Sequence, residues 1–203
     1  MKPVLLFVHG WGFDASMWGA VRARFAPEDT LAWDLGFFGA PAQPPPPPGR
    51  PVIAVGHSFG TLWLLHRRKL PWAAMVAING FTCFARREGF PHGVAPRVLA
   101  RMRRRLQEAS SDVVSEFLAA CGYTAPTLAT PNIEALEKGL AALETWDERA
   151  ATPTLALCGE GDTLVPPEMS RACFSEISWH EGGHLLPLEA PDWCAAELAK
   201  LLA

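Results

Sequence analysis

The length, composition and charge of this chain exclude several kinds of protein before any motif is considered. Its 203 residues, of which 49% are hydrophobic, suffice for one compact domain with a sizeable core. The formal net charge of -3 gives no overall attraction to nucleic acid or acidic membranes, so we expect neither as a partner. The first apolar run, Val4 to Val8, is too short for a signal-peptide core or a membrane span. We therefore expect a soluble, cytoplasmic protein.

Six short apolar runs along the chain are typical of strands that are buried on both faces. In chain order they cover residues 4–8, 30–33, 52–55, 73–78, 154–158 and 175–179. Stretches compatible with helices lie between and after them, for example at 58–69 and 192–202. This alternation predicts an α/β fold with a doubly wound, mostly parallel sheet of about six strands.

The interval 81–150 breaks the alternation, because it has helical periodicity but no convincing strand. Apolar stripes at helical spacing run through 113–121 and 133–143, and Thr130 before Pro131 is typical of a helix start. We predict an α/β core formed by residues 1–80 and 151–203, with 81–150 inserted as a helical cap. Packing alone would require the same stripes, so the pattern does not prove that the insertion covers a site.

Two compositional biases accompany this organisation. Five consecutive prolines, Pro44 to Pro48, should form a stiff polyproline II segment, which we interpret as a rigid surface connector rather than a ligand for a proline-recognising domain. Residues 97–105 are rich in arginine, whereas the later part of the insertion is mainly acidic. The arginines form either a solvated helix face or an anion-binding surface, and the sequence leaves both open.

The segment from Val52 to Gly60 joins an apolar strand to a helix-compatible stretch through the pattern G-x-S-x-G. This is the context of a nucleophile elbow, in which the turn is strained and its glycines allow close backbone packing. The start of the following helix favours developing negative charge. We therefore predict that Ser58 is a nucleophile at the carboxyl edge of the sheet.

A serine hydroxyl needs a base to take its proton and a third group to orient that base. In folds with this elbow, the chain order is serine, acid, histidine. Asp162 follows the run at 154–158 and His184 follows the run at 175–179, so a parallel sheet would bring both to the edge that carries Ser58. We predict these three as the catalytic residues. The competing carboxylate, Glu160, is expected to cap the loop or face solvent.

Acyl transfer also needs hydrogen-bond donors for the oxyanion. The main-chain N–H of Phe59, directly after the nucleophile, is one candidate. The second should come from the loop after an early strand, and we assign it to the main chain of Trp11, whose indole can line the substrate pocket. The neighbouring His9 is expected to brace this loop rather than to react.

Two other chemistries compete with this interpretation. The segment from His180 to His184 matches the zinc-binding pattern H-E-x-x-H, which requires both histidines on one face of a helix. Its two glycines would each cost about 1 kcal/mol in a helix, and Pro187 follows closely, so we predict no metal site. The five cysteines are odd in number and contain no C-x-x-C pair, so we expect reduced, mostly buried thiols.

These motifs resemble those of the pimeloyl-acyl-carrier-protein methyl ester carboxylesterases, a family of the α/β-hydrolase superfamily. The resemblance implies hydrolysis of the methyl ester on a pimeloyl chain held by acyl carrier protein, in biotin synthesis and without a cofactor. It covers nearly the whole chain. The segments that carry it are His9 to Gly12, Met17-Trp18, Asp34-Leu35, Gly56 to Gly60, Cys83 to Arg86, Phe117-Leu118, Gly161 to Pro166 and Gly183-His184.

The resemblance also implies roles for residues of the insertion. Phe117 matches a cap phenylalanine that flanks the acyl chain, and basic cap residues hold the acidic carrier protein in such enzymes. This chain departs from that pattern, because acidic residues such as Asp112 and Glu116 stand around Phe117 and the cap is shortened. We hypothesise that a nearby group of arginines substitutes in carrier docking: Arg101, Arg103, Arg104 and Arg105.

Two alternatives stay open at this point. An esterase or thioesterase acting on small molecules would use the same triad, and a binding protein on a hydrolase scaffold would have no turnover at all. The complete set of Ser58, Asp162 and His184 argues against the second.

Overall fold

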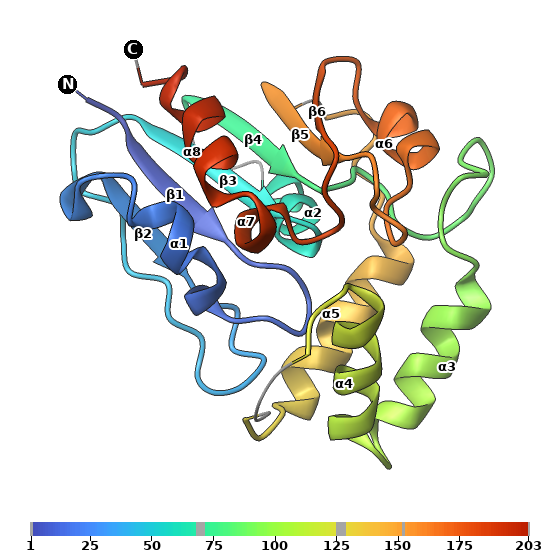
Figure 1. Cartoon of the computed structure of the whole chain (residues 1–203). Helices are drawn as coiled ribbons and strands as arrows, with labels where there is room; N and C mark the ends of the chain where they lie inside the picture. Colours follow the sequence, from blue (N-terminus) through green and yellow to red (C-terminus); the bar gives the residue numbers. More distant parts are fainter. Residues whose placement is uncertain (1, 68–71, 125–128, 152, 203) are drawn as a thin grey trace.

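The computed structural model describes residues 2–67, 72–124, 129–151 and 153–202. Six strands form one sheet in the order β2-β1-β3-β4-β5-β6, and every neighbouring pair is parallel (Figure 1). The predicted α/β fold with a parallel sheet of about six strands is therefore confirmed. The strands are β1 (Val4–Val8), β2 (Thr30–Trp33), β3 (Val52–His57), β4 (Ala74–Ile78), β5 (Leu155–Gly159) and β6 (Ile177–His180).

The apolar runs became strands because the sheet is covered on both sides. All residues of β1 and β3 are buried, which explains their continuous rather than alternating hydrophobicity. The edge strand β6 is only partly buried and begins two residues later than the predicted run at 175–179. The strand β3 continues to His57, two residues beyond the predicted run, and so leads directly into the turn at Ser58.

Helices cover both faces of this sheet. On one face, α1 packs with α7 and α8, while α2 lies on the opposite face and α6 packs against β5 (Figure 1). The predicted helix at 58–69 begins at Phe59, and residues 68–71 lie outside the described residues. These helices are α1 (Gly19–Arg22), α2 (Phe59–His66), α6 (Pro167–Cys173), α7 (Leu186–Glu189) and α8 (Pro191–Ala199), with two 3-10 helices, η1 (Ala15–Trp18) and η2 (Pro27–Asp29).

Three further helices lie in the chain between β4 and β5: α3 (Pro96–Leu106), α4 (Ser110–Ala120) and α5 (Ile133–Thr145). The described part of 81–150 contains isolated bridges but no strand. The three helices lie beyond the carboxyl ends of the strands, with α3 packed on both α4 and α5 (Figure 1). The expected helix start at Thr130-Pro131 is wrong, because the side chain of Asn132 caps α5 by accepting from the N–H of Ala135.

The proline-rich connector between β2 and β3 runs over the surface and is mostly exposed. Its first part is held by the indole N–H of Trp33, which donates to the carbonyl of Pro44 over 2.8 Å. At its end, the guanidinium of Arg50 donates to the carbonyls of Pro3 and Glu28. The connector is therefore held to β2 near its start, and to η2 and the residue before β1 at its end.

The strand order determines where a site can form. Because β1 lies between β2 and β3, the connections from β1 and from β3 leave toward opposite sides of the sheet. Loops diverge at such a switch point and leave a crevice at the carboxyl ends of the strands. The loop from His9 to Gly12 follows β1, and Ser58 follows β3, so both lie at this crevice.

Replacement of Gly60 by Ala is expected to lower the free energy of unfolding by about 3 kcal/mol, because overpacking of backbone cannot be relieved by a rotamer change. A Cβ at Gly60 would lie 2.3 Å from the carbonyl oxygen of Val8 and 2.7 Å from that of His9. Urea titration followed by circular dichroism gives the value. The matched control is Gly19→Ala, where nothing lies within 4 Å of the added Cβ. Equal stability of the two variants would contradict this close packing.

Candidate active site

Ser58 lies at the turn between β3 and α2, in a backbone conformation that few residues with a side chain adopt. Its φ is 50° and its ψ is -121°. The turn is possible because Gly56 and Gly60, two residues away on either side, lack side chains: a Cβ on Gly56 would lie 2.5 Å from the nitrogen of Thr61. The side chain of Ser58 makes no capping hydrogen bond to α2. Its hydroxyl is therefore free to engage groups from other loops.

The structure brings Ser58, His184 and Asp162 into one hydrogen-bonded chain. The distance from Ser58 Oγ to His184 Nε2 is 3.1 Å, and that from His184 Nδ1 to Asp162 Oδ2 is 2.8 Å. All three residues are buried, with 4% or less of their surface exposed. With Nδ1–H donating to the carboxylate, Nε2 is left as the acceptor for the serine hydroxyl. This arrangement can take a proton from the hydroxyl and stabilise the resulting imidazolium.

The carboxylate of Asp162 is held in a turn directly after β5. Its Oδ1 accepts from the main-chain N–H groups of Leu164 and Val165, at 2.9 and 2.8 Å. The competing acid, Glu160, is exposed, and its main-chain N–H donates to the carbonyl of His180. Asp162, and not Glu160, therefore lies against His184.

A fourth residue of this network, Asn79, escaped the sequence analysis. It follows β4 and donates from Nδ2 to Asp162 Oδ2 over 2.9 Å and to the carbonyl of Gly183 over 3.1 Å. Its φ is 45°, in the left-handed region, where Asn is enriched among residues other than Gly. The available signal was the Asn79-Gly80 pair at the end of an apolar run, since this dipeptide marks a backbone turn with positive φ.

Close backbone contacts place the loop that carries His184. A Cβ on Gly159, at the end of β5, would lie only 2.3 Å from the carbonyl oxygen of Gly183. The carbonyl of His184 itself lies 2.9 Å from Nε2 of the fully buried His57. Burial and the neighbouring His184 lower the pKa of His57 well below its usual range. His57 is therefore neutral at pH 7, and its Nε2–H donates to the main-chain carbonyl of His184. This hydrogen bond helps to hold the backbone of His184 in place.

The loop after β1 passes directly beside Ser58. A Cβ on Gly10 would lie 3.2 Å from the Cβ of Ser58. Within the described residues, neither the N–H of Trp11 nor that of Phe59 has a hydrogen-bond acceptor. Two main-chain donors without an acceptor thus lie in the segments next to the serine: Trp11 directly after Gly10, and Phe59 directly after Ser58. The neighbouring His9 lies inside the loop, where its Nδ1 bonds the carbonyl of Gly10 and its Nε2 accepts from the N–H of Leu35.

The side chain of Trp11 joins this loop to the helical insertion. Its indole N–H donates to the carbonyl of Leu136 in α5 over 2.9 Å, and α5 approaches closely because Gly139 faces the ring. The ring of Phe117 from α4 packs edge-on against Trp11, with 4.8 Å between centroids. Phe117 therefore lies beside the loop that flanks Ser58, although it comes from a distant part of the sequence.

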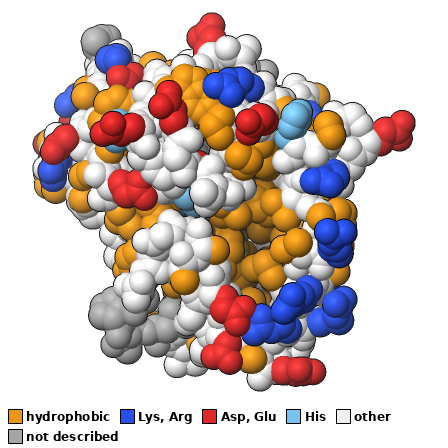
Figure 2. Space-filling view, turned by 45° about the vertical axis from the view of Figure 1, so that its right-hand side comes forward, with side chains coloured by type: hydrophobic (Ala, Val, Ile, Leu, Met, Phe, Trp, Pro, Cys, Tyr) orange, Lys and Arg blue, Asp and Glu red, His pale blue; other side chains and the backbone are white. Residues whose placement is uncertain are grey.

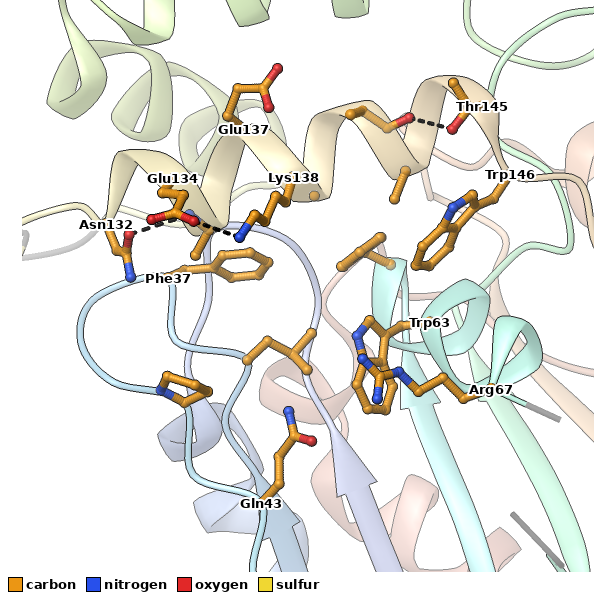
Figure 3. Close-up of a pocket in the computed structure, with 17 residues that line it drawn as sticks. Phe37, Gln43, Trp63, Arg67, Asn132, Glu134, Glu137, Lys138, Thr145 and Trp146 are labelled. Atoms are coloured by element: carbon orange, nitrogen blue, oxygen red, sulfur yellow. Dashed lines mark hydrogen bonds and ion pairs between the residues drawn. The ribbon is translucent and has the colours of Figure 1, made fainter. Parts of the chain in front are cut away.

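Two of the cavities beside α5 have apolar or aromatic walls. The smaller, of about 230 Å³, lies between α3, α4 and α5 and is mainly apolar; Phe117 lines it, with Arg105 and Glu116 among its polar residues. On the face turned forward in Figure 2, hydrophobic side chains gather in a hollow, with Lys and Arg side chains grouped beside it. The larger cavity, of about 680 Å³, lies between α5, α2 and the loop after β2, with Trp63 and Trp146 on its wall (Figure 3).

The four arginines assigned to carrier docking divide into two pairs. Arg103 is bound to Glu137 and Glu144, and Arg105 forms a two-point ion pair with Glu116. Arg101 and Arg104 are exposed and have no ion pair within the part of the chain that the structure describes. The second pair, together with the likewise exposed Arg97, is therefore the part of this arginine group that is not engaged in an ion pair within the described residues.

The H-E-x-x-H segment does not form a helix, as its glycines predicted. His180 lies in β6, where its Nδ1 accepts from the N–H of Gly182, whereas His184 belongs to the hydrogen-bonded chain with Ser58. Among the described residues, no group of three or more His, Cys, Asp or Glu side chains could hold a metal ion. None of the described helices is long and apolar enough to cross a bilayer.

The family follows from the match of the whole chain. A model described as the alpha/beta hydrolase family matches residues 5–197. The chain therefore belongs to the α/β-hydrolase family and is a hydrolase.

The more particular resemblance is confirmed by its relatives. The pimeloyl-acyl-carrier-protein methyl ester esterase of Klebsiella pneumoniae is 31% identical over 80% of this chain and 76% of its own length. The protein of the same name from Stenotrophomonas maltophilia is 28% identical, over 99% of this chain and 93% of its own. Among solved structures, an esterase from Exiguobacterium antarcticum superposes with a TM-score of 0.77 at 15% identity, over 100% of this chain and 93% of that one. That likeness supports the fold alone.

The cysteine thiols are expected to be unreactive in the folded protein. Burial raises the pKa of Cys83 to about 11. It raises the pKa values of Cys121, Cys158 and Cys194 to about 12, so the reactive thiolate is scarce. At about pH 8, an aromatic disulfide reagent should therefore label no more than one thiol, the half-buried Cys173, before unfolding and all five afterwards. Rapid labelling of two or more in the native state would be the contrary result.

Proposed function

We propose that this hydrolase is a serine carboxylesterase that cleaves the methyl ester of a pimeloyl chain carried by acyl carrier protein, in the cytoplasm. The observation that carries the esterase part is the buried chain from Ser58 Oγ through His184 to Asp162. The carrier-bound substrate is supported by the names of the relatives that match most of this chain.

In the proposed reaction, Ser58 Oγ attacks the ester carbonyl carbon while His184 Nε2 takes its proton. The imidazolium then donates this proton to the departing methoxide, which leaves as methanol, and an acyl-enzyme remains. A water molecule, deprotonated by His184, releases the free carboxylate and restores the serine. Asp162 accepts from Nδ1–H throughout and stabilises the charged imidazole.

The tetrahedral intermediates need donors where negative charge develops. The N–H groups of Trp11 and Phe59 are assigned to this role because Phe59 follows Ser58, Trp11 follows Gly10 beside Ser58, and neither N–H has an acceptor within the described chain. The position of Phe59 at the first residue of α2 adds the positive end of a helix to the same point.

The insertion at 81–150 is proposed to act as a cap that binds the acyl chain. The supporting feature is the mainly apolar cavity between its three helices, lined by Phe117 at the end near Trp11. Apolar walls suit a methylene chain, since each buried methylene contributes about 0.8 kcal/mol. Carrier docking is assigned to Arg101 and Arg104, because Arg103 and Arg105 are engaged in ion pairs within the insertion.

A fluorophosphonate probe should label the wild-type protein, and the Ser58→Ala variant should carry no adduct. The same variant is expected to lose about 10⁴-fold or more of kcat on a short activated ester, because it lacks the nucleophile. His184→Ala should be similarly inactive. Intact-protein mass spectrometry measures the adduct. Labelling that persists in Ser58→Ala, or activity that a chelator abolishes, would refute the serine mechanism.

Charge reversal at Arg101 or Arg104 tests the carrier. Each of Arg101→Glu and Arg104→Glu should raise KM for the carrier-bound ester about 3- to 10-fold, the size expected for an exposed ion pair between proteins. The kinetics on a free short ester should be unchanged. Arg171→Glu, an equal charge change at an exposed position on α6, is the control.

The outcome also separates the two substrate classes. Equal kcat/KM on the carrier-bound ester and on the free ester, with no effect of either substitution, would favour an esterase for small molecules with the same triad. The ion pairs of Arg103 and Arg105 within the insertion support this alternative. They leave fewer free positive charges for binding a carrier protein than the sequence suggested.

A further inference from the structure

The acid of the catalytic chain has more hydrogen-bond donors than the triad requires. Oδ2 of Asp162 accepts from His184 Nδ1 at 2.8 Å and from Asn79 Nδ2 at 2.9 Å. With the two main-chain donors on Oδ1, four donors surround one buried carboxylate. Of these, Asn79 is the only side chain besides the base itself.

The same amide group also reaches the loop that carries the base. Nδ2 of Asn79 has two hydrogens, and the second is directed to the carbonyl of Gly183, the residue before His184, over 3.1 Å. One planar group therefore fixes the acid and the approach to the base relative to each other. No other side chain among the described residues bonds both segments.

The backbone of Asn79 is held in a conformation that is unfavourable for most residues with a side chain. Its φ of 45° lies in the left-handed region, and its N–H donates to the carbonyl of Leu157 in β5 over 2.8 Å. The residue is 1% exposed. Strain of this kind persists where the surroundings over-determine a conformation, which is typical of functional sites. Asn tolerates this region, and Gly adopts it without a penalty.

We propose that Asn79 is a positioning residue for ester hydrolysis, which holds the Asp162 carboxylate and the His184 loop in the geometry that the reaction needs. The proposal rests on the serine esterase function proposed above. Asn79 donates to the oxygen that faces the base, so it sets the rotation of the carboxyl group and hence the line from Oδ2 to His184 Nδ1. It acts through Asp162 and through the loop that carries His184, and it touches no reacting atom.

Two substitutions separate this role from the backbone requirement. Asn79→Gly keeps the left-handed backbone and removes the donor, whereas Asn79→Asp keeps the shape and places a second carboxylate against Asp162. Asn79→Gly should lower kcat about 10- to 100-fold with little change in KM, since small misplacements of catalytic groups have effects of this size. Asn79→Asp should lower kcat further, because like charges then share the site.

Thr82→Ala is the matched control in the same segment. Its hydroxyl is buried without a partner in the described chain, so its loss should leave kcat at the wild-type value. All variants are assayed on a short activated ester, and their unfolding temperatures are measured in parallel. A loss of kcat in Asn79→Gly at an unfolding temperature close to that of the control supports positioning rather than loss of fold.

A double-mutant cycle with Asp162→Ala decides whether Asn79 acts through the acid. In that background, Asn79→Gly should have a much smaller effect on kcat, because the carboxylate is absent and only the contact to the Gly183 carbonyl remains to be lost. An equal loss in both backgrounds, or wild-type kcat in Asn79→Gly, would overturn the inference. Failure of the proposed function gives a different result, namely equal activity of the wild type and Ser58→Ala.

Discussion

The active site depends on backbone segments that touch without side chains between them at the carboxyl ends of the strands. Gly60 lies against the carbonyls that end β1, and Gly159 lies against the carbonyl of Gly183. The first contact seats the helix that begins after Ser58, and the second seats the loop that ends at His184. A methyl group would not fit at either point. The distance between Ser58 and His184 is therefore set by packed backbone rather than by flexible contacts.

A buried carboxylate in such a site is stable only when its hydrogen bonds are satisfied. The donors to Asp162 come from its own turn, from Asn79 after β4 and from His184 after β6. Hydrogen-bond donors from the ends of three separate strands thus bind the one carboxylate of Asp162. All of these residues except Leu164 are buried, and the energy of any one contact in such a network is measurable only by double-mutant cycles.

The core and the insertion contribute different parts of the candidate site. The core holds the hydrogen-bonded chain of Ser58, His184 and Asp162, whereas the two cavities described above lie against the insertion. The link between them is Trp11, whose main chain flanks Ser58 and whose indole is bound to Leu136 in α5. A shift of α5 would therefore also move the loop beside Ser58.

The sequence by itself determined the sheet, the elbow at Ser58 and the order of acid and base, because hydrophobic periodicity and glycine positions are local properties. It did not reveal the role of Asn79, whose hydrogen-bond partners are 83 and 104 positions away in the chain. It also did not reveal that Arg103 and Arg105 form ion pairs with Glu137 and Glu116. Only the tertiary structure decided these, since a hydrogen bond or ion pair between distant segments depends on packing that no local pattern encodes.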